Sequence, residues 1–452
     1  MSRRFPIKAT ANPAKLAESI TFPTSKKTAR NRIMKAALTE RVATWNPEDP
    51  LNNGIPTQEL CNMYEKYSHG GYGMLISGNT CIDPIHLETA GNVIIHESID
   101  SPQRRAAFKQ YAAAFKADPK NLAIVQLNSG GRQTPLAYCE HPIAPSDIQL
   151  TDARGGIACG KPRALETDEI KPLIIDNFVY AAKYVYEAGF DGVQIHVAHG
   201  FLLAQFLSER INNRTDRYGG SLENRARIVL EIYEAIREII PAETGFIIGL
   251  KVTSADFDSG DVKVDDALWL CKEFERIGYD FIEFGGGANE VIEGEIRAAS
   301  TIKRDAFYLE VAKQLRSSLD KIILYFTGGF RTVHGMVSAV ESGLCDGVGI
   351  GGPTASEFDL PAKILSGQVQ SAIFNPWNQD YGLRKYACNT QMWQAQQTPY
   401  DPNVDINAGL LDVSDEAAAE KYKKALLVYF AKISEANKKS LPVHGVFEYQ
   451  DI

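Results

Sequence analysis

Short apolar runs alternate with longer amphipathic stretches along most of the chain. The run at residues 192–196 is one example, and it follows Gly189, where a helix-like pattern ends. A short β-branched run after a helix-ending glycine is typical of a buried parallel strand. The same pattern, a helix-ending glycine followed by an apolar strand, recurs near Gly71, Gly278 and Gly343. A repeated helix-to-strand connection of this kind indicates a parallel α/β fold.

Eight strands can be placed on this pattern, with helices between them. The predicted strands span residues 32–38, 74–77, 122–127, 192–196, 246–252, 281–284, 322–326 and 347–350. Helical spacing of apolar residues predicts helices at 101–117, 168–188, 264–277, 307–317 and 332–341, and another that begins after Ser221. We therefore expect an α/β fold, a (β/α)8 TIM barrel with a C-terminal helical extension. A doubly wound sheet is the alternative, but even alternation without a Gly-x-Gly-x-x-Gly turn after the first strand argues against it.

The regular pattern is interrupted at two places. A stretch rich in Pro, Gly and Asp at residues 128–165 predicts a long loop that partly covers the barrel mouth. Residues 1–370 are expected to form the barrel and residues 371–452 an extension. This extension contains a polar linker and a predicted helix at 415–438, capped by Ser414, which packs on the barrel or on a neighbouring subunit.

Composition and charge narrow the class of protein. The chain is 44% hydrophobic and 23% charged, which is ordinary for a globular protein, and its net charge of -8 argues against a partner such as nucleic acid or a membrane surface. No apolar run reaches the length of a membrane span, and the N-terminus lacks a convincing targeting segment. Seven cysteines without a Cys-x-x-Cys motif fit reduced thiols in a cytoplasmic protein and exclude an obvious zinc or iron–sulfur site. A homo-oligomer is compatible with all of this.

Two histidines stand three residues apart where the fourth predicted strand ends. In an α/β protein the carboxyl ends of buried strands carry the chemistry. His196 and His199 could be two satisfied, partly buried histidines, or a zinc pair, although no Cys, Asp or Glu cluster lies near them in the sequence. The third interpretation is a pair of N–H donors that holds one anionic oxygen. The pattern alone favours the first and third interpretations equally.

Polar residues and glycines stand at the other strand ends. Thr39, Asn79, Gln126 and Lys251 stand at the carboxyl ends of other strands, and the side chains of Thr39, Gln126 and Lys251 suit a flat, hydrogen-bonding ring. The last three strand ends are rich in glycine, namely Gly286, Gly328, Gly329, Gly351 and Gly352. Glycine lets backbone N–H groups approach a bound group, and phosphate sites recur at strands seven and eight of such barrels. The glycines could instead only relieve crowding in tight loops, but two consecutive glycine-rich ends favour a phosphorylated cofactor.

A longer motif connects these positions with a known family. Residues 213–225 read Asn-Arg-Thr-Asp-Arg-Tyr-Gly-Gly-Ser-Leu-Glu-Asn-Arg, and Asn31-Arg32-Ile33 leads to Ala37-Leu38-Thr39-Glu40. With these motifs the chain resembles the Old Yellow Enzyme family of FMN-dependent ene-reductases over roughly residues 1–370. The resemblance implies non-covalently bound FMN, NADPH or NADH as reductant, and an enone substrate whose activated C=C bond is reduced.

The resemblance also implies roles for single residues. His196 and His199 match the His/His version of a clamp that binds the substrate carbonyl oxygen while hydride passes from flavin N5 to the β-carbon. Gln126, Thr39 and Lys251 match contacts to the flavin ring, with Thr39 at its carbonyl and Lys251 near its N1 edge. The implied cofactor-binding set is Ala37, Leu38, Thr39, Asn79, Gln126, His196, Lys251, Gly286, Gly328, Gly329, Gly351 and Gly352. No metal is implied.

Two positions depart from the family pattern. Phe201 stands where most members carry a tyrosine that protonates the α-carbon, and phenylalanine cannot donate a proton. Gly352 stands where the family has a phosphate-binding arginine. The leading hypothesis is an FMN-dependent NAD(P)H oxidoreductase that reduces enones. Phe201 motivates a flavin-dependent alkene isomerase as the alternative, and Gly352 motivates a barrel without FMN or catalytic activity.

Overall fold

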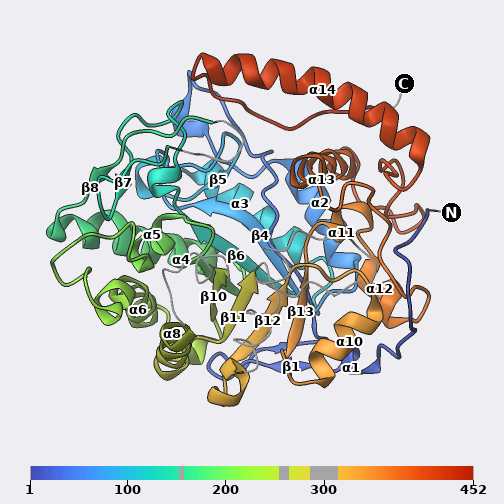
Figure 1. Ribbon diagram of the computed structural model, residues 1–452, viewed down its shortest axis with the longest axis horizontal. Coiled ribbons are helices and arrows are strands. Elements are labelled where there is room, and N and C mark those ends of the chain that lie inside the picture. Colours follow the sequence, from blue (N-terminus) through green and yellow to red (C-terminus); the bar gives the residue numbers. More distant parts are fainter. Residues whose placement is uncertain (1, 152–156, 254–263, 286–313, 451–452) are drawn as a thin grey trace.

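A closed barrel of eight parallel strands forms the centre of the computed structural model, which describes residues 2–151, 157–253, 264–285 and 314–450 (Figure 1). The strands are β3 (Ile33–Lys35), β4 (Met74–Cys81), β6 (Leu122–Asn128), β9 (Gly192–His196), β10 (Ile247–Thr253), β11 (Phe281–Gly285), β12 (Ile323–Thr327) and β13 (Gly347–Ile350). They pair in sequence order, and β3 closes the barrel by pairing with both β13 and β4. The predicted (β/α)8 barrel is confirmed.

The strand boundaries differ from the prediction mainly at the first two strands. β3 ends at Lys35, so residues 36–38 leave the sheet and lead to Thr39. β4 continues to Cys81, and its last two residues pair with both β5 (Val93–Ile94) and β6. The register of β4 with β6 shifts between Ile76 and Asn79. Both differences lie at the carboxyl ends of strands, where the site residues stand.

Helices surround the barrel, and several begin at a serine or threonine cap, of which the sequence predicted Ser221. The larger ones are α2 (Gln58–His69), α3 (Pro102–Phe115), α4 (Asp176–Ala188), α6 (Leu222–Ile239), α8 (Val264–Ile277) and α10 (Val333–Glu341). The side chains of Ser101, Ser221 and Thr332 accept backbone N–H bonds at the starts of α3, α6 and α10. The predicted helix at 168–188 is divided into η4 (Thr167–Glu169), the wider π-type turn η5 (Lys171–Ile175) and α4. Of the helix predicted at 307–317, residues 307–313 lie outside the described residues.

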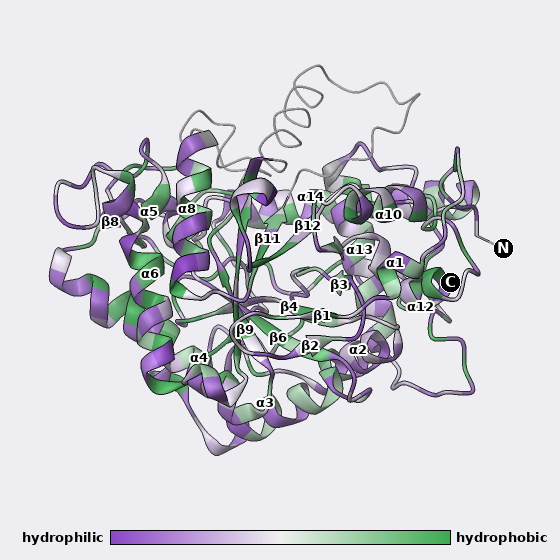
Figure 2. Cartoon of the chain, turned by 90° about the horizontal axis from the view of Figure 1, so that it is seen from below, coloured by the Kyte–Doolittle hydropathy of each residue, from purple (hydrophilic) through white to green (hydrophobic). Residues whose placement is uncertain are grey.

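Short helices and strands lie in the segments that connect the larger elements. They are α1 (Ala14–Ala17), α5 (Leu202–Leu207), α11 (Pro353–Ser356), α12 (Leu360–Leu365), η1 (Pro50–Asn52), η2 (Glu97–Ile99), η3 (Gly131–Gln133), η6 (Ala242–Thr244), β7 (Ile143–Ala144) and β8 (Arg163–Ala164). A hairpin of β1 (Ile20–Thr21) and β2 (Thr28–Ala29) packs Ile20, Phe22 and Ala29 against residues at the amino ends of the barrel strands. The hairpin therefore closes the end of the barrel opposite the site. Figure 2 shows the apolar strands at the centre and hydrophilic residues on the surrounding helices.

The C-terminal extension contains two helices, of which the sequence predicted one. α13 (Tyr381–Gln396) packs beside α2 and α11, and its Cys388, Met392 and Ala395 join the barrel core. α14 (Glu416–Lys438) lies along the edge of the molecule above α13 (Figure 1). Its N-cap is Asp415, which accepts from the N–H of Ala418, so the prediction that Ser414 caps this helix was wrong.

Within the described ranges, no helix combines the length and the apolar character needed to cross a membrane.

Candidate active site

The two predicted histidines meet at the carboxyl end of β9. The Nε2 atom of His196 lies 3.0 Å from the Nδ1 atom of His199. His199 has a left-handed backbone with φ of +60°, which is uncommon for a residue other than glycine. Its carbonyl oxygen accepts a hydrogen bond of 2.7 Å from Gln133, in the long loop that follows β6. The local backbone thus turns the exposed His199 ring back towards the buried His196 ring.

His196 is a neutral hydrogen-bonding group in this environment. Burial, together with the neighbouring His199 and Lys251, lowers its pKa well below the ordinary value. A neutral imidazole carries one N–H, and the buried Nδ1 atom has no hydrogen-bond partner among the described residues. Placing the hydrogen on Nε2 directs the donor towards His199 and leaves only a lone pair unsatisfied.

Phe201 forms an apolar wall beside this pair. Its ring centroid lies 5.0 Å from that of His196, and the side chain is 8% exposed. It stands at the start of α5, where the chain leaves the turn that contains His199. The structure therefore brings together the three residues His196, His199 and Phe201.

A buried polar chain crosses the barrel beneath the histidines. Gln126 donates to Gln194 at 2.6 Å, and Gln194 donates to Glu283 at 2.8 Å. Lys251 forms a 2.9 Å ion pair with Glu283, a charge contact without the geometry of a directed hydrogen bond. Gln126 and Lys251 were predicted site residues, whereas Gln194 and Glu283 were missed. A charged residue within an apolar strand such as β11 was the signal that could have revealed Glu283.

A second missed carboxylate lies at the ends of β3 and β4. The hydroxyl of Thr39 donates to Glu88 at 2.9 Å, and Asn79 donates to the same oxygen at 2.5 Å. A threonine hydroxyl has a single hydrogen. In this arrangement Thr39 can accept a further hydrogen bond but cannot donate one, whereas the expected contact with a flavin carbonyl needs a donor. Ala37 and Leu38 are half-buried and lead from β3 to this contact.

The glycines after the seventh and eighth strands have different conformations. Gly328 and Gly329 adopt φ values of +125° and +80°, which L-residues with side chains rarely adopt. A Cβ atom at Gly351 would lie 3.6 Å from the Leu38 side chain, and one at Gly352 would lie 3.4 Å from the Cys388 sulfur. The first pair needs glycine for its backbone, whereas a Cβ atom at either position of the second pair makes only ordinary van der Waals contact. The predicted site residue Gly286 lies outside the described residues.

Three buried polar atoms indicate that a ligand such as FMN fits this end of the barrel. Asn79 Oδ1, His196 Nδ1 and Thr327 Oγ1 have no hydrogen-bond partner in the part of the chain that the structure describes. They lie near the carboxyl ends of β4, β9 and β12. Because buried polar groups are nearly always hydrogen-bonded, these atoms fit the polar edge of a bound ring system. Over the same ranges, no group of three His, Cys, Asp or Glu side chains is arranged to hold a metal ion.

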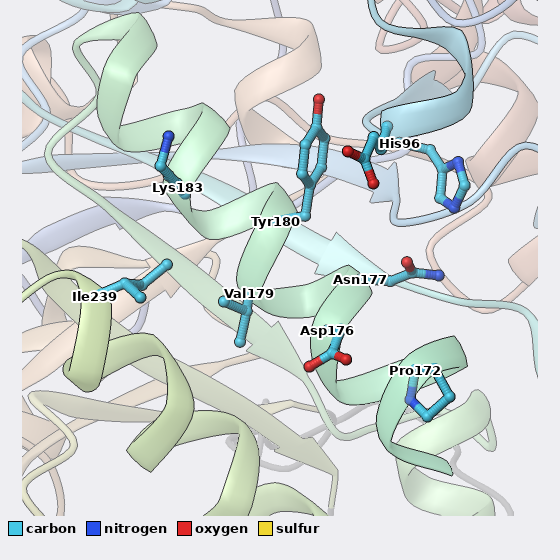
Figure 3. A pocket seen from close by; sticks show the side chains of 9 residues that line it. His96, Pro172, Asp176, Asn177, Val179, Tyr180, Lys183 and Ile239 are labelled. Carbon is cyan, nitrogen blue, oxygen red and sulfur yellow. The ribbon is translucent and has the colours of Figure 1, made fainter. Parts of the chain in front are cut away.

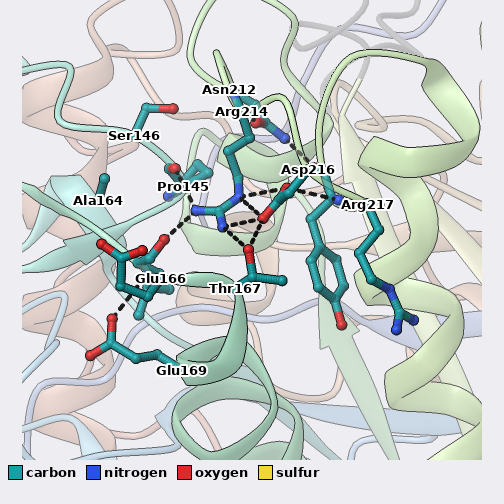
Figure 4. Close-up of polar contacts among 12 residues, drawn as sticks. Pro145, Ser146, Ala164, Glu166, Thr167, Glu169, Asn212, Arg214, Asp216 and Arg217 are labelled. Atoms are coloured by element: carbon teal, nitrogen blue, oxygen red, sulfur yellow. Dashed lines mark hydrogen bonds and ion pairs between the residues drawn. The ribbon is translucent and has the colours of Figure 1, made fainter.

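The long motif at residues 213–225 has a structural role. Arg214 donates to Asp216 at 3.0 Å, to Thr167 at 3.4 Å and to the carbonyl of Pro145 at 3.1 Å (Figure 4). Asn213 donates from its backbone to Ser146 at 3.0 Å. These bonds tie the segment that follows α5 to the long loop after β6. The motif therefore fixes the loops around the barrel mouth.

A surface hollow lies away from these residues. It has a volume of about 480 Å3 and lies along α4, where Asp176, Tyr180 and Lys183 line it (Figure 3). Asp176 is paired with Lys171 at 2.6 Å, an exposed contact on the outside of the barrel. The hollow contains none of the residues at the strand ends.

Comparison with known proteins identifies similar sequences and folds. Residues 17–369 match the model of the NADH:flavin oxidoreductase / NADH oxidase family. The chain is 39% identical to the NADH-dependent flavin oxidoreductase nadA of Aspergillus parasiticus, over 85% of this chain and 86% of that protein. It is 33% identical to the NADH-dependent flavin oxidoreductase iliE of Hypocrea jecorina, over 75% of this chain and 86% of that protein.

Solved structures agree with this result. Morphinone reductase superposes with a TM-score of 0.64 at 25% identity, covering 82% of this chain and 94% of that one. An old yellow enzyme homologue from Zymomonas mobilis superposes with a TM-score of 0.63 at 26% identity, covering 79% and 94%.

Proposed function

The chain belongs to the NADH:flavin oxidoreductase / NADH oxidase family, which confirms its resemblance to Old Yellow Enzyme, and we propose that it reduces the activated C=C bond of α,β-unsaturated carbonyl compounds. It is a flavin-dependent NAD(P)H oxidoreductase, and FMN is the cofactor of its family. The observation that carries the proposal is the convergence of His196 Nε2 and His199 Nδ1 at 3.0 Å.

The histidine pair is suited to hold a carbonyl oxygen. When the substrate binds, His196 turns its Nε2–H from His199 to the carbonyl oxygen. His199, whose hydrogen lies on Nε2 while Nδ1 accepts, donates that N–H to the same oxygen. Donors placed where negative charge develops stabilise the transition state of the reaction. Because its pKa is low, His196 stays neutral over the physiological pH range and presents one N–H and one lone pair.

The residues beneath the pair orient the cofactor. FMN, when bound, supplies the hydride transfer between the nicotinamide nucleotide and the substrate. Gln194 fixes the amide of Gln126, and Glu283 fixes the ammonium group of Lys251. A rigid supporting layer of this kind keeps binding groups in one geometry.

Phe201 supports an isomerase as a second candidate function. The position nearest to His196 on the α5 side is an apolar ring that cannot deliver a proton to the substrate α-carbon. Without prompt protonation, hydride can return to the cofactor after rotation about the former C=C bond of the substrate. The E or Z geometry of the alkene is then inverted without net reduction.

Anaerobic mixing separates these functions. The purified protein is mixed first with NADH or NADPH and then with 2-cyclohexenone or with an acyclic E-enone, while the flavin absorbance and the products are followed. We expect the nucleotide to bleach the flavin and the enone to restore its colour, with one nucleotide consumed for each C=C bond reduced. Isomerised alkene without stoichiometric consumption of nucleotide would favour the isomerase. No flavin absorbance in protein supplied with FMN would contradict both functions.

A further inference from the structure

Helix α13 of the C-terminal extension lies against the turn that follows the eighth barrel strand. The sulfur of Cys388 lies 3.6 Å from the carbonyl oxygen of Gly352. The next residue, Asn389, donates to the carbonyl of Thr39 at 2.9 Å. The helix therefore contacts the chain beyond both the first and the eighth strand, beside α11 (Figure 1). This is the region where the phosphate group of FMN is expected.

Arg384 lies one helical turn before Cys388, on the same face of α13. Residues four apart on a helix are neighbours on its surface. The pKa of the Cys388 thiol agrees with this placement, because burial raises it to about 11 while Arg384 and Arg331 act in the opposite direction. The Nη1 atom of Arg384 donates to the carbonyl of Asn378 at 2.9 Å. The face that carries Arg384 is thus the face that meets Gly352.

Arg331, which comes from the barrel, is also hydrogen-bonded to Asn378. It follows the Gly328–Gly329 turn and is 9% exposed. Its Nη2 atom donates to Oδ1 of Asn378 at 3.0 Å. Asn378 therefore holds one guanidinium group from the seventh-strand turn and one from the extension. Two cations held in this way repel each other, and a phosphate dianion bound by both offsets the repulsion.

We propose that Arg384 replaces the guanidinium group that position 352 lacks and that, with Arg331, it binds the phosphate of FMN. The inference rests on the proposed function, because it requires an FMN-binding barrel. Arginine suits the role because its planar fork can bind two phosphate oxygens at once. The C-terminal extension is then part of the cofactor site.

The test compares FMN with riboflavin, which has the same ring without the phosphate. Full-length apoprotein is titrated with each compound, and Kd is obtained from the change in flavin fluorescence. Because hydrogen bonds between charged groups are strong, Arg384→Gln should raise the Kd for FMN about 10- to 100-fold. It should leave the Kd for riboflavin unchanged. Lys385→Gln is the matched control, since Lys385 is the adjacent exposed cation on α13.

Three further results complete the test. Adding Gly352→Arg to Arg384→Gln should restore tight FMN binding, because a Cβ atom at position 352 has only the Cys388 sulfur within 4 Å, at 3.4 Å. Equal FMN affinity in Arg384→Gln and the parent would overturn the inference, and so would an equal loss of FMN and riboflavin affinity, which indicates a structural role. A parent protein that binds no FMN would also overturn the proposed function. A parent that reduces enones while Arg384→Gln binds FMN normally would overturn this inference alone.

Discussion

Lys251 and Glu283 face each other on adjacent barrel strands and form an ion pair of 2.9 Å. Both side chains are buried, and Gln194 donates a hydrogen bond to the second carboxylate oxygen of Glu283. The carboxylate therefore balances the cation that was expected at the flavin. Because Lys251 is buried, the stability of the barrel should depend on the negative charge of Glu283.

Glu283→Gln should destabilise the protein because it leaves the ammonium group of Lys251 buried without its countercharge. Loss of one partner of a buried pair typically costs roughly 3–5 kcal/mol. Denaturant unfolding of the apoprotein measures this cost. The control is Glu273→Gln, which removes a surface pair with Arg276 and should have a much smaller effect, because solvent screens an exposed pair. Equal effects of the two substitutions would show that Lys251 does not depend on Glu283.

The histidine pair should act on the substrate and on phenols that imitate it. A phenol bound over oxidised flavin with its oxygen on His196 and His199 should give a long-wavelength charge-transfer band. The double variant His196→Ala, His199→Ala should abolish the band and slow oxidation of the enzyme by enones. Reduction by NADPH should remain largely intact. Stoichiometric zinc that is lost in the double variant would contradict this role.

The ion pair between Arg214 and Asp216 should contribute to stability in a defined pH range. Although partial burial acts in the opposite direction, hydrogen bonds from Arg214 and Thr167 lower the pKa of Asp216 from 3.8 to about 2. A carboxylate with a lowered pKa stabilises the fold fully above about pH 4, and this stabilisation is lost as the pH falls towards 2. Asp216→Asn should therefore reduce stability by roughly 1–2 kcal/mol at neutral pH.

Unfolding measured at pH 7, 4 and 3 tests this prediction. The difference between Asp216→Asn and the parent should shrink between pH 4 and 3. Asp176→Asn is the control, because Asp176 is half exposed in its pair with Lys171. A difference that stays constant over this range would contradict the assignment to Asp216.

The sequence predicted the barrel and the residues at its strand ends because both follow from local patterns. Parallel strands bring their carboxyl ends together, so His196, Gln126 and Lys251 could be placed near one another before the structure was known. Gln194 and Glu283 were missed because they lie inside strands that the apolar pattern defines. Glu88 was missed because it comes from a loop, whose path depends on tertiary contacts.

Helix α13 shows a different limit of prediction. It contains three Gln, one Asn and three aromatic residues, without a clear apolar stripe. The helix is held by tertiary contacts with α2 and α11, which no local pattern encodes. For this reason the family motifs marked Gly352 as a position that lacks an arginine but did not point to Arg384, which lies 32 residues further along the chain.

After hydride transfer the substrate α-carbon must receive a proton. The histidines stabilise charge on the carbonyl oxygen, but Phe201, 5.0 Å from His196 between ring centroids, cannot protonate the carbon. A positioned acid typically contributes about 10²–10⁴-fold to such a step. We expect slow net reduction of weakly activated enones, and normal reduction of substrates whose anions are stabilised by a strong electron-withdrawing group.

Phe201→Tyr should speed the reduction of weak enones because it adds a donor beside His196. Phe201 is buried at the start of α5, so the added hydroxyl should face the site or destabilise the fold. Unfolding measurements separate these two effects. Stopped-flow mixing with 2-cyclohexenone should show a faster oxidative half-reaction in the variant and an unchanged reductive half-reaction with NADPH. A parent enzyme that already reacts rapidly, with no gain from Phe201→Tyr, would show that another group delivers the proton and that Phe201 only forms an apolar wall.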